Sequence, residues 1–173
     1  MKKVAIFGNS GGGKSTLAHA LAQELGLPLY ALDKLQYKPG GEAVPHEDYL
    51  NAHQAVLEQN TWVIEGYGCY PSVMQRIEEA DTLIHIDLPL WRHWLWVTKR
   101  MFKGFFFTPQ GWPEKSPMLK STLNSYRVLW PCHSKLTPVY RRALQKHQQA
   151  KKVYSLKSPA QIRGFLAHIK KTP

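Results

Sequence analysis

The hydrophobic positions of this 173-residue chain follow two alternating patterns. Short continuous apolar runs such as residues 4–7 are typical of strands buried on both faces, whereas apolar residues from 17 to 25 recur at helical spacing until Gly26. The alternation continues to the end of the chain. It predicts further strands at 27–32, 61–64, 82–86 and 152–156, helices at 47–59, 71–79, 90–103 and 160–169, and helical stretches on both sides of Pro131.

Strands that alternate with helices, and that are almost continuously apolar, favour a parallel sheet covered by helices on both faces. The predicted fold class is therefore α/β. A chain of 173 residues has room for one well-buried core, so we expect a single domain over residues 1–173. Ligands of such sheets bind at the carboxyl ends of the strands, where polar residues are of most interest.

A glycine-rich segment, GNSGGGKST, connects the first predicted strand to the first predicted helix. It matches G-x-x-x-x-G-K-[ST] at every constrained position, in the strand–loop–helix context that a phosphate-binding loop requires. The lysine would reach the β- and γ-phosphates of a nucleoside triphosphate, and the following serine would hold Mg²⁺. The predicted nucleotide-binding residues are Gly8, Ser10, Gly11, Gly12, Gly13, Lys14, Ser15 and Thr16.

A carboxylate follows each of the next three predicted strands: Asp33, Glu65 and Asp87. A Mg²⁺-phosphate site with a proton acceptor needs such groups, one to hold a metal-bound water and another to take the proton of an attacking hydroxyl. Asp and Glu also cap helices and begin turns, so a purely structural role is the alternative for each of them.

Charge is distributed unevenly within the net +11. Residues 1–90 hold six Lys or Arg against eleven acids, and residues 91–173 hold seventeen against one acid, Glu114. This asymmetry indicates that the second half faces an anionic ligand. Polyphosphate, nucleic acid and an acidic membrane surface would all fit, and a basic surface without specific purpose is the alternative.

The segment 91–107 combines aromatic and basic residues. We expect a helix that packs one apolar face into the core; closure of 105–112 over a base or acceptor, single-stranded nucleic acid stacking and membrane-surface binding are the alternatives. The predicted apolar face comprises Trp91, Trp94, Leu95, Thr98, Met101, Phe102 and Phe105, opposite Arg92, Lys99 and Lys103.

Several motifs resemble those of the P-loop kinases of the adenylate kinase and shikimate kinase group, and more narrowly the small topology-modulation (FlaR-related) proteins. The matching segments are Gly8 to Thr16, LDKL at 32–35 with Pro39 and Gly40, WVIEGY at 62–67, Ala80 with Asp81, IDLP at 86–89, Arg100, and VYSLKS at 153–158.

The resemblance implies a five-stranded parallel sheet in the order 2-3-1-4-5, with a lid at about 104–134. It also implies that Asp33 lies near the phosphoryl acceptor and that Arg100 clamps phosphate. Glu65 with the glycine after it stands where related kinases have an acid–glycine pair. Arg127 would add charge to the lid and is a further predicted nucleotide-binding residue. Arg141 and Arg142 would also add charge to the lid. This chain has no arginine between its second and third strands, and only Arg76 between the third and the fourth.

Together these observations predict an ATP- and Mg²⁺-dependent kinase that acts on a small molecule: a nucleoside, a nucleotide or another hydroxyl compound. The predicted catalytic residues are Lys14, Asp33, Glu65 and Arg100, and the predicted metal ligands are Ser15, Glu65 and Asp87. Hydrolysis of ATP without acceptor is compatible with such a site. The alternative is a nucleotide-gated nucleic-acid-binding protein involved in DNA topology.

Two features of the sequence, its cysteines and its apolar runs, bear on the cellular location of the protein. Cys69 and Cys132 lie far apart without metal-type spacing, so neither a disulfide framework nor a zinc site is expected. No apolar run approaches the length of a membrane span. A reducing cytoplasmic setting is the simplest expectation.

Overall fold

The computed structural model describes residues 1–104 and 118–171. The strands are β1 (Lys3–Gly8), β2 (Leu29–Ala31), β3 (Trp62–Glu65), β4 (Thr82–Ile86) and β5 (Lys152–Leu156). The helices are α1 (Lys14–Leu25), α2 (Leu32–Gln36), α3 (His46–Leu57), α4 (Tyr70–Glu79), α5 (Leu90–Gly104), α6 (Met118–Pro131), α7 (Thr137–His147) and α8 (Pro159–Lys171), with a π-helical turn, η1 (Cys132–Leu136), between α6 and α7.

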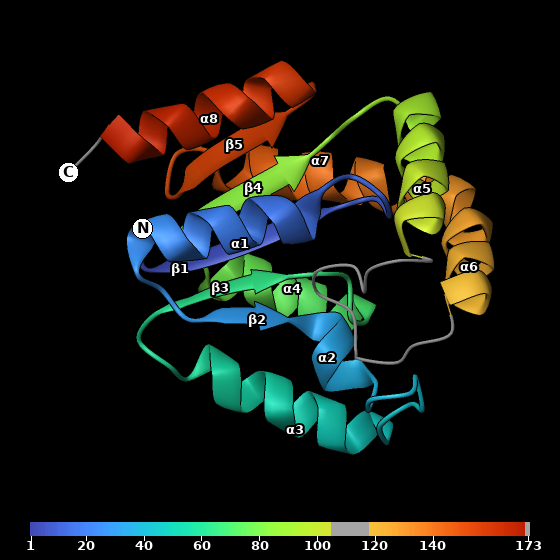
Figure 1. Cartoon of the computed structure of the whole chain (residues 1–173). Coiled ribbons are helices and arrows are strands. Elements are labelled where there is room, and N and C mark those ends of the chain that lie inside the picture. The colour runs from blue at the N-terminus through green and yellow to red at the C-terminus, as the bar shows by residue number, and fades with distance from the viewer. Residues whose placement is uncertain (105–117, 172–173) are drawn as a thin grey trace.

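The five strands form one parallel sheet in the order β2-β3-β1-β4-β5, which confirms the predicted fold class (Figure 1). The first strand lies in the centre, where Ala5 pairs with Ile64 of β3 on one side and with Leu83 of β4 on the other. All strands therefore end at the same edge of the sheet, and the loops that follow β1, β2, β3 and β4 meet there.

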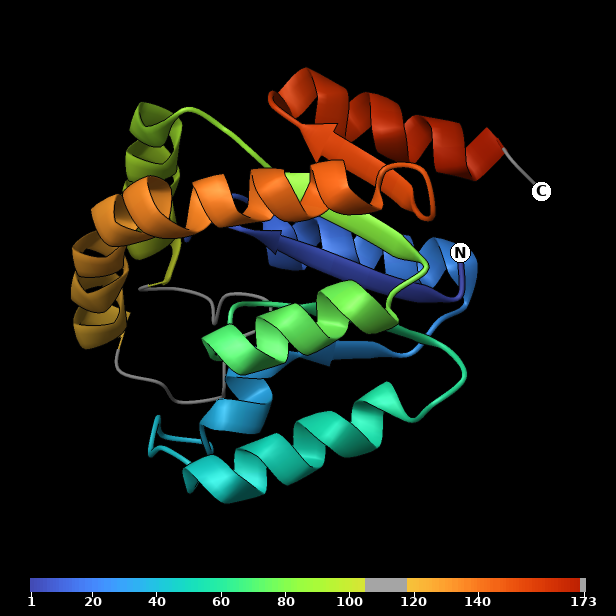
Figure 2. The same ribbon diagram turned by 180° about the vertical axis from the view of Figure 1, so that it is seen from behind.

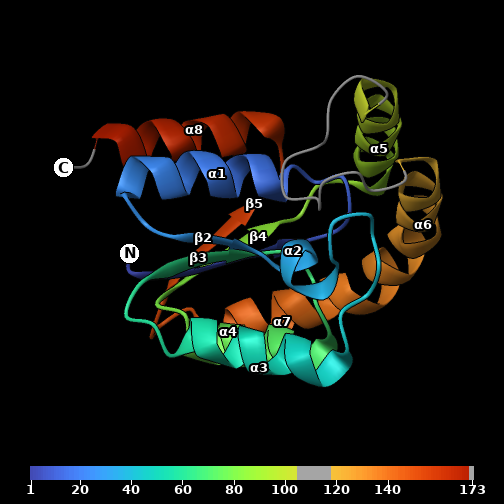
Figure 3. The same cartoon turned by 60° about the horizontal axis from the view of Figure 1, so that its bottom comes forward.

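Each face of the sheet is covered by its own helical layer, because successive side chains of a strand point in opposite directions. Val4 and Ile6 belong to the core beneath α1 and α8, whereas Ala5 and Phe7 belong to the core on the side of α3, α4 and α7. Figures 1 and 2 show the two layers from opposite sides, and Figure 3 shows them with the bottom of the molecule turned forward. Continuous apolar strands are thus required here by burial on both faces.

The second strand is shorter than the sequence predicted. It ends at Ala31, and Leu32 begins the five-residue helix α2 instead of extending the strand. Leu32 is fully buried. Asp33 lies in the first turn of α2, where a carboxylate interacts favourably with the exposed N–H groups of a helix start. This turn directs Asp33 to the edge of the sheet at which β1 and β3 also end.

The prediction that the apolar face of the helix after β4 packs into the core was wrong. Trp91, Leu95 and Phe102 have exposed fractions of 55%, 50% and 61%, whereas His93 and Val97 are buried. The reason is that α5 does not cover the sheet. It stands with α6 beyond the carboxyl ends of the strands (Figures 1 and 3). There it packs against the glycine-rich loop, where the His93 side chain hydrogen-bonds a backbone carbonyl.

Within residues 1–104 and 118–171, no helix combines the length and the apolar character needed to cross a bilayer. Phe105 and the expected closing segment 105–112 lie outside the described residues, as does most of the first half of the expected lid. The second half of that lid is α6 and the start of η1.

Candidate active site

The glycine-rich loop runs from the end of β1 to the first residue of α1, as predicted. Gly11 and Gly13 have φ angles of 66° and 80°, in the left-handed region that favours glycine. A side chain at Gly11 would also clash, since its Cβ would lie 2.6 Å from the Cγ2 atom of Val97 on α5. The loop thus depends on glycine both for its backbone conformation and for its contact with α5.

Asn9 organises this loop, although the motif leaves its position unconstrained. Its carbonyl oxygen accepts a hydrogen bond from the Lys14 ammonium at 2.9 Å and one from the Gly12 N–H at 3.3 Å. Its side chain accepts from the Ser10 N–H at 2.8 Å and donates to the Leu129 carbonyl of α6 at 2.9 Å. Asn9 therefore ties the loop to α6 and holds the lysine across it.

Three predicted catalytic residues, Asp33, Glu65 and Arg100, lie within electrostatic reach of the fourth, Lys14, at this edge of the sheet. Burial lowers the pKa of Lys14, and the Glu65 and Asp33 carboxylates oppose that shift. Burial raises the pKa of Asp33, against the opposing charges of Lys14 and Arg100. Burial likewise raises the pKa of Glu65, with Lys14 again opposing. The site thus places two carboxyls of raised proton affinity beside cations.

Ser15 and Glu65 lie near each other beside the lysine. The Ser15 hydroxyl lowers the pKa of the Glu65 carboxyl, against the effect of its burial at the end of β3. Hydroxyl and carboxylate oxygens are the ligands that Mg²⁺ prefers, and Mg²⁺ usually takes only one or two from the protein and the rest from phosphates and water. Within the described ranges no three His, Cys, Asp or Glu side chains gather to hold a metal.

Arg100 enters the cluster from α5. Its Nη2 atom donates to the Ser125 hydroxyl of α6 at 2.6 Å, and burial lowers its pKa while Asp33 opposes. The guanidinium thus joins the α5–α6 pair to Asp33.

Asp87 is engaged differently from the other strand-end carboxylates. Arg141 of α7 donates two hydrogen bonds to it, from Nε and Nη2, each at 2.9 Å. Arg141 was expected to carry lid charge, and its partner could not be inferred because the two residues lie 54 positions apart. The metal role of Asp87 stays a prediction. Arg127 lies exposed on α6 and Arg142 exposed on α7.

Arg76 holds the loop that follows Glu65. It is buried, and it donates from Nε to the Ser72 carbonyl, from Nη1 to the Gly66 carbonyl and from Nη2 to the Tyr67 carbonyl, at 3.1, 3.1 and 2.7 Å. Its guanidinium therefore satisfies backbone acceptors. The sequence offered no signal for this role beyond the presence of the arginine.

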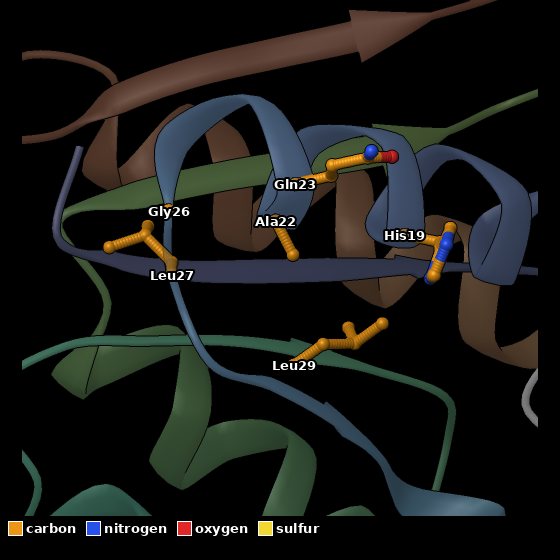
Figure 4. Close-up of a pocket in the computed structure, with 6 residues that line it drawn as sticks. All are labelled: His19, Ala22, Gln23, Gly26, Leu27 and Leu29. Carbon is orange, nitrogen blue, oxygen red and sulfur yellow. The ribbon is translucent and has the colours of Figure 1, made fainter.

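A surface hollow of ≈ 410 Å³ lies away from these residues, between α1 and the start of β2 (Figure 4). His19, Gln23, Gly26 and Leu29 are among the residues that line it. None of the predicted site residues belongs to it.

Comparisons with solved structures identify the fold. The structure is similar to shikimate kinase from Acinetobacter baumannii in complex with shikimate (TM-score 0.60, 14% identity, covering 98% of this chain and 90% of that one). It is also similar to shikimate kinase from Bacteroides thetaiotaomicron (0.51, 18%, 97% and 96%) and to an unliganded sugar kinase from Janibacter sp. (0.50, 18%, 100% and 96%).

These likenesses show that the chain has the P-loop NTPase fold found in shikimate kinases. Identities below a fifth show the fold alone. No protein-family model matches the sequence, and no curated protein matches it either.

Proposed function

We propose that this protein is an ATP-dependent kinase that transfers the γ-phosphoryl group to a hydroxyl of a small molecule. The observation that carries the proposal is the cluster in which Lys14 of the glycine-rich loop meets two carboxyls of raised pKa, Asp33 and Glu65. The likeness to kinases that phosphorylate small molecules, one of them bound to shikimate, supports it.

Each residue has a distinct part in the proposed transfer. Lys14 and the backbone N–H groups of the loop bind the phosphates, and Arg100 neutralises charge on the transferring group. The acceptor oxygen attacks the γ-phosphorus, the bond to the β–γ bridging oxygen breaks, and ADP leaves with that electron pair. Asp33 takes the hydroxyl proton, a task that its raised pKa favours.

Mg²⁺ would be held by Ser15 and, through water, by Glu65, and when bound it supplies positive charge at the phosphate oxygens. The hydroxyl–carboxylate pair already present there supports this assignment. A role of Asp87 as a further metal ligand would require it to share its carboxylate with Arg141.

The acceptor is best sought among hydroxyl compounds that bring no phosphate. Nucleoside monophosphates need a cation for their phosphate, and Arg76 already donates from all three of its nitrogens to backbone carbonyls. Nucleosides, sugars and hydroxy acids therefore come before nucleotides.

The narrower relation to adenylate kinase-like topology-modulation proteins, and a cytoplasmic location, belong to the same proposal. They rest on the sequence motifs and on the two unpaired thiols, Cys69 and Cys132.

The test measures ADP release from ATP and Mg²⁺ across a panel of nucleosides, nucleoside monophosphates, sugars and hydroxy acids. Lys14→Ala is the blank, and Lys34→Ala, which alters an exposed lysine nearby, is the matched control. We expect one acceptor class to stimulate ADP release in the wild type and in Lys34→Ala, but not in Lys14→Ala. Undiminished activity of Lys14→Ala, or stimulation by single-stranded DNA alone, would overturn the proposal.

A further inference from the structure

One face of the α5–α6 pair presents apolar and basic side chains to solvent. On α5 the exposed residues recur at intervals of four, four and three, which places them on one helix face. On α6 the intervals are four and three. This α5–α6 surface consists of Trp91, Leu95, Lys99 and Phe102 on α5 with Leu123, Arg127 and Trp130 on α6.

The exposure of this surface is large for apolar side chains. The exposed fractions of Leu95, Phe102, Leu123 and Trp130 are 50%, 61%, 54% and 64%. Singly exposed apolar residues are normal, but a contiguous set marks an interaction site.

The two helices that carry these residues pack against each other. Trp94 of α5 stacks on Tyr126 of α6 with ring centroids 5.0 Å apart, and the Tyr126 hydroxyl hydrogen-bonds Thr98. The opposite face of α5 is occupied, because His93 and Val97 contact the glycine-rich loop. The exposed residues therefore point away from the rest of the molecule.

Charge identifies the class of partner. The described residues from Leu88 to Lys171 contain no aspartate or glutamate. Lys99 and Arg127 lie within the surface, and Arg92 lies over the Trp91 ring at 4.4 Å from its centroid. A second copy of the chain meeting the same surface would bring like charges together, so an anionic partner fits better.

We propose that the α5–α6 surface binds to the face of an anionic phospholipid bilayer and lies in its interface without crossing it. Helices that lie in the membrane interface combine Trp, Phe and Leu with Lys and Arg, whose stems cover apolar area while their charges reach the headgroups. Single-stranded nucleic acid fits less well, because it needs free aromatic faces. Within this surface Arg92 covers Trp91 and two positions are leucines, which leaves Phe102 and Trp130 as its open aromatic rings.

This binding would place the nucleotide site close to the lipid. The helix that carries half of the surface touches the glycine-rich loop with its other face, and a helix with its side chains is roughly 10 Å across. The kinase reaction proposed above and the membrane contact are carried by different faces of α5. Either can therefore be tested without the other.

The experiment measures co-sedimentation of the full chain with vesicles of phosphatidylcholine alone and of phosphatidylcholine mixed with phosphatidylglycerol. Arg127→Glu is compared with Arg163→Glu, which makes the same charge change at an exposed position of α8. The pair Leu95→Gln and Leu123→Gln is compared with Val128→Gln, an exposed valine about 140° around α6 from Leu123. Thermal melting verifies that every variant is folded.

We expect the wild type to bind the anionic vesicles, less strongly as salt rises, with a blue shift of tryptophan fluorescence. Arg127→Glu should lower the partition coefficient by about fivefold or more, since one basic residue near the surface contributes roughly that factor. The two leucine variants should lower it as well, whereas Arg163→Glu should do so only slightly and Val128→Gln not at all.

Three results would overturn the proposal: no binding to the anionic vesicles, equal losses in Arg127→Glu and Arg163→Glu, or binding of a single-stranded oligonucleotide through these residues without binding of lipid. None of these results depends on phosphoryl transfer. The loss of the kinase reaction in the assay above would leave vesicle binding intact.

Discussion

The Nδ1 atom of His93 lies 2.9 Å from the carbonyl oxygen of Ser10, and this contact joins α5 to the glycine-rich loop. The ring also lies close to Gly12, where a Cβ atom would be 3.1 Å from its Cε1 atom. Burial lowers the pKa of His93 to about 4, so the imidazole is neutral at pH 7. A neutral ring can donate to a carbonyl only from a protonated nitrogen, and this contact therefore selects the Nδ1–H tautomer.

Replacing His93 by Leu should weaken nucleotide binding, because the loop loses the hydrogen bond that holds the Ser10 carbonyl in place. One such bond is worth about 1 kcal/mol, which corresponds to a roughly fivefold increase in Kd. His93→Asn should restore much of the affinity, because its amide can donate at about the position of Nδ1. Titration with a fluorescent ATP analogue measures Kd, and thermal melting separates this effect from global stability. Equal Kd values for wild type and His93→Leu would contradict a positioning role.

The Asp87–Arg141 pair should stabilise the fold mainly above the titration range of the aspartate. Burial alone would raise the pKa of Asp87, but the hydrogen bonds from Arg141, together with the charges of His85, Arg141 and Lys157, outweigh it and lower this pKa. A lowered pKa gives stability that is present above the unfolded-state value and is lost as the pH falls through the folded-state value.

Arg141→Gln leaves the buried carboxylate without its cation, so we expect a loss of about 1–3 kcal/mol in the free energy of unfolding at pH 7. The loss should shrink toward pH 3. Urea unfolding over this range measures it, with Arg142→Gln, an exposed neighbour on α7, as the matched control. An equal effect of both variants at pH 7 would show that the pair contributes nothing specific.

His53 should make the protein sensitive to acid. It is fully buried on α3, neither ring nitrogen has a hydrogen-bond partner among the described residues, and burial with the nearby charge of Arg76 lowers its pKa to about 4. As the pH falls from about 6.5 toward 4, the unfolded chain takes up a proton that the folded state excludes, and stability falls.

His53→Leu removes this titration. Its advantage over the wild type in urea unfolding should therefore grow with acidity, by up to about 1.4 kcal/mol per pH unit between pH 6.5 and pH 4, and stay constant above pH 7. A difference that does not change with pH would mean that His53 is accommodated when charged.

The order of elements could be inferred because it depends on local periodicity. The apolar runs of β1, β3 and β4 and the helical spacing of α1 need no knowledge of distant residues, and neither does the glycine-rich loop between them. Asp33 and Glu65 could be placed beside Lys14 for a related reason: parallel strands end at one edge, so residues that follow them converge.

The orientation of α5 could not be inferred in the same way. Its sequence has an apolar face, and the prediction assigned that face to the core. In the structure α5 packs on a loop of backbone polar groups, which favours a histidine at the contact and a small valine beside Gly11. The faces of a helix are properties of the sequence, but the surface that covers each face belongs to the tertiary structure.

By itself, then, the sequence determined most of the elements, the phosphate-binding loop and the carboxylates that accompany it, since each follows from spacing within one segment or from the common edge of a parallel sheet. Only the tertiary structure decided which side chains support them. The partners Asn9 and Leu129, His93 and Ser10, and Arg141 and Asp87 are separated by 120, 83 and 54 positions. Such contacts depend on how the helices pack around the sheet, which no local pattern records.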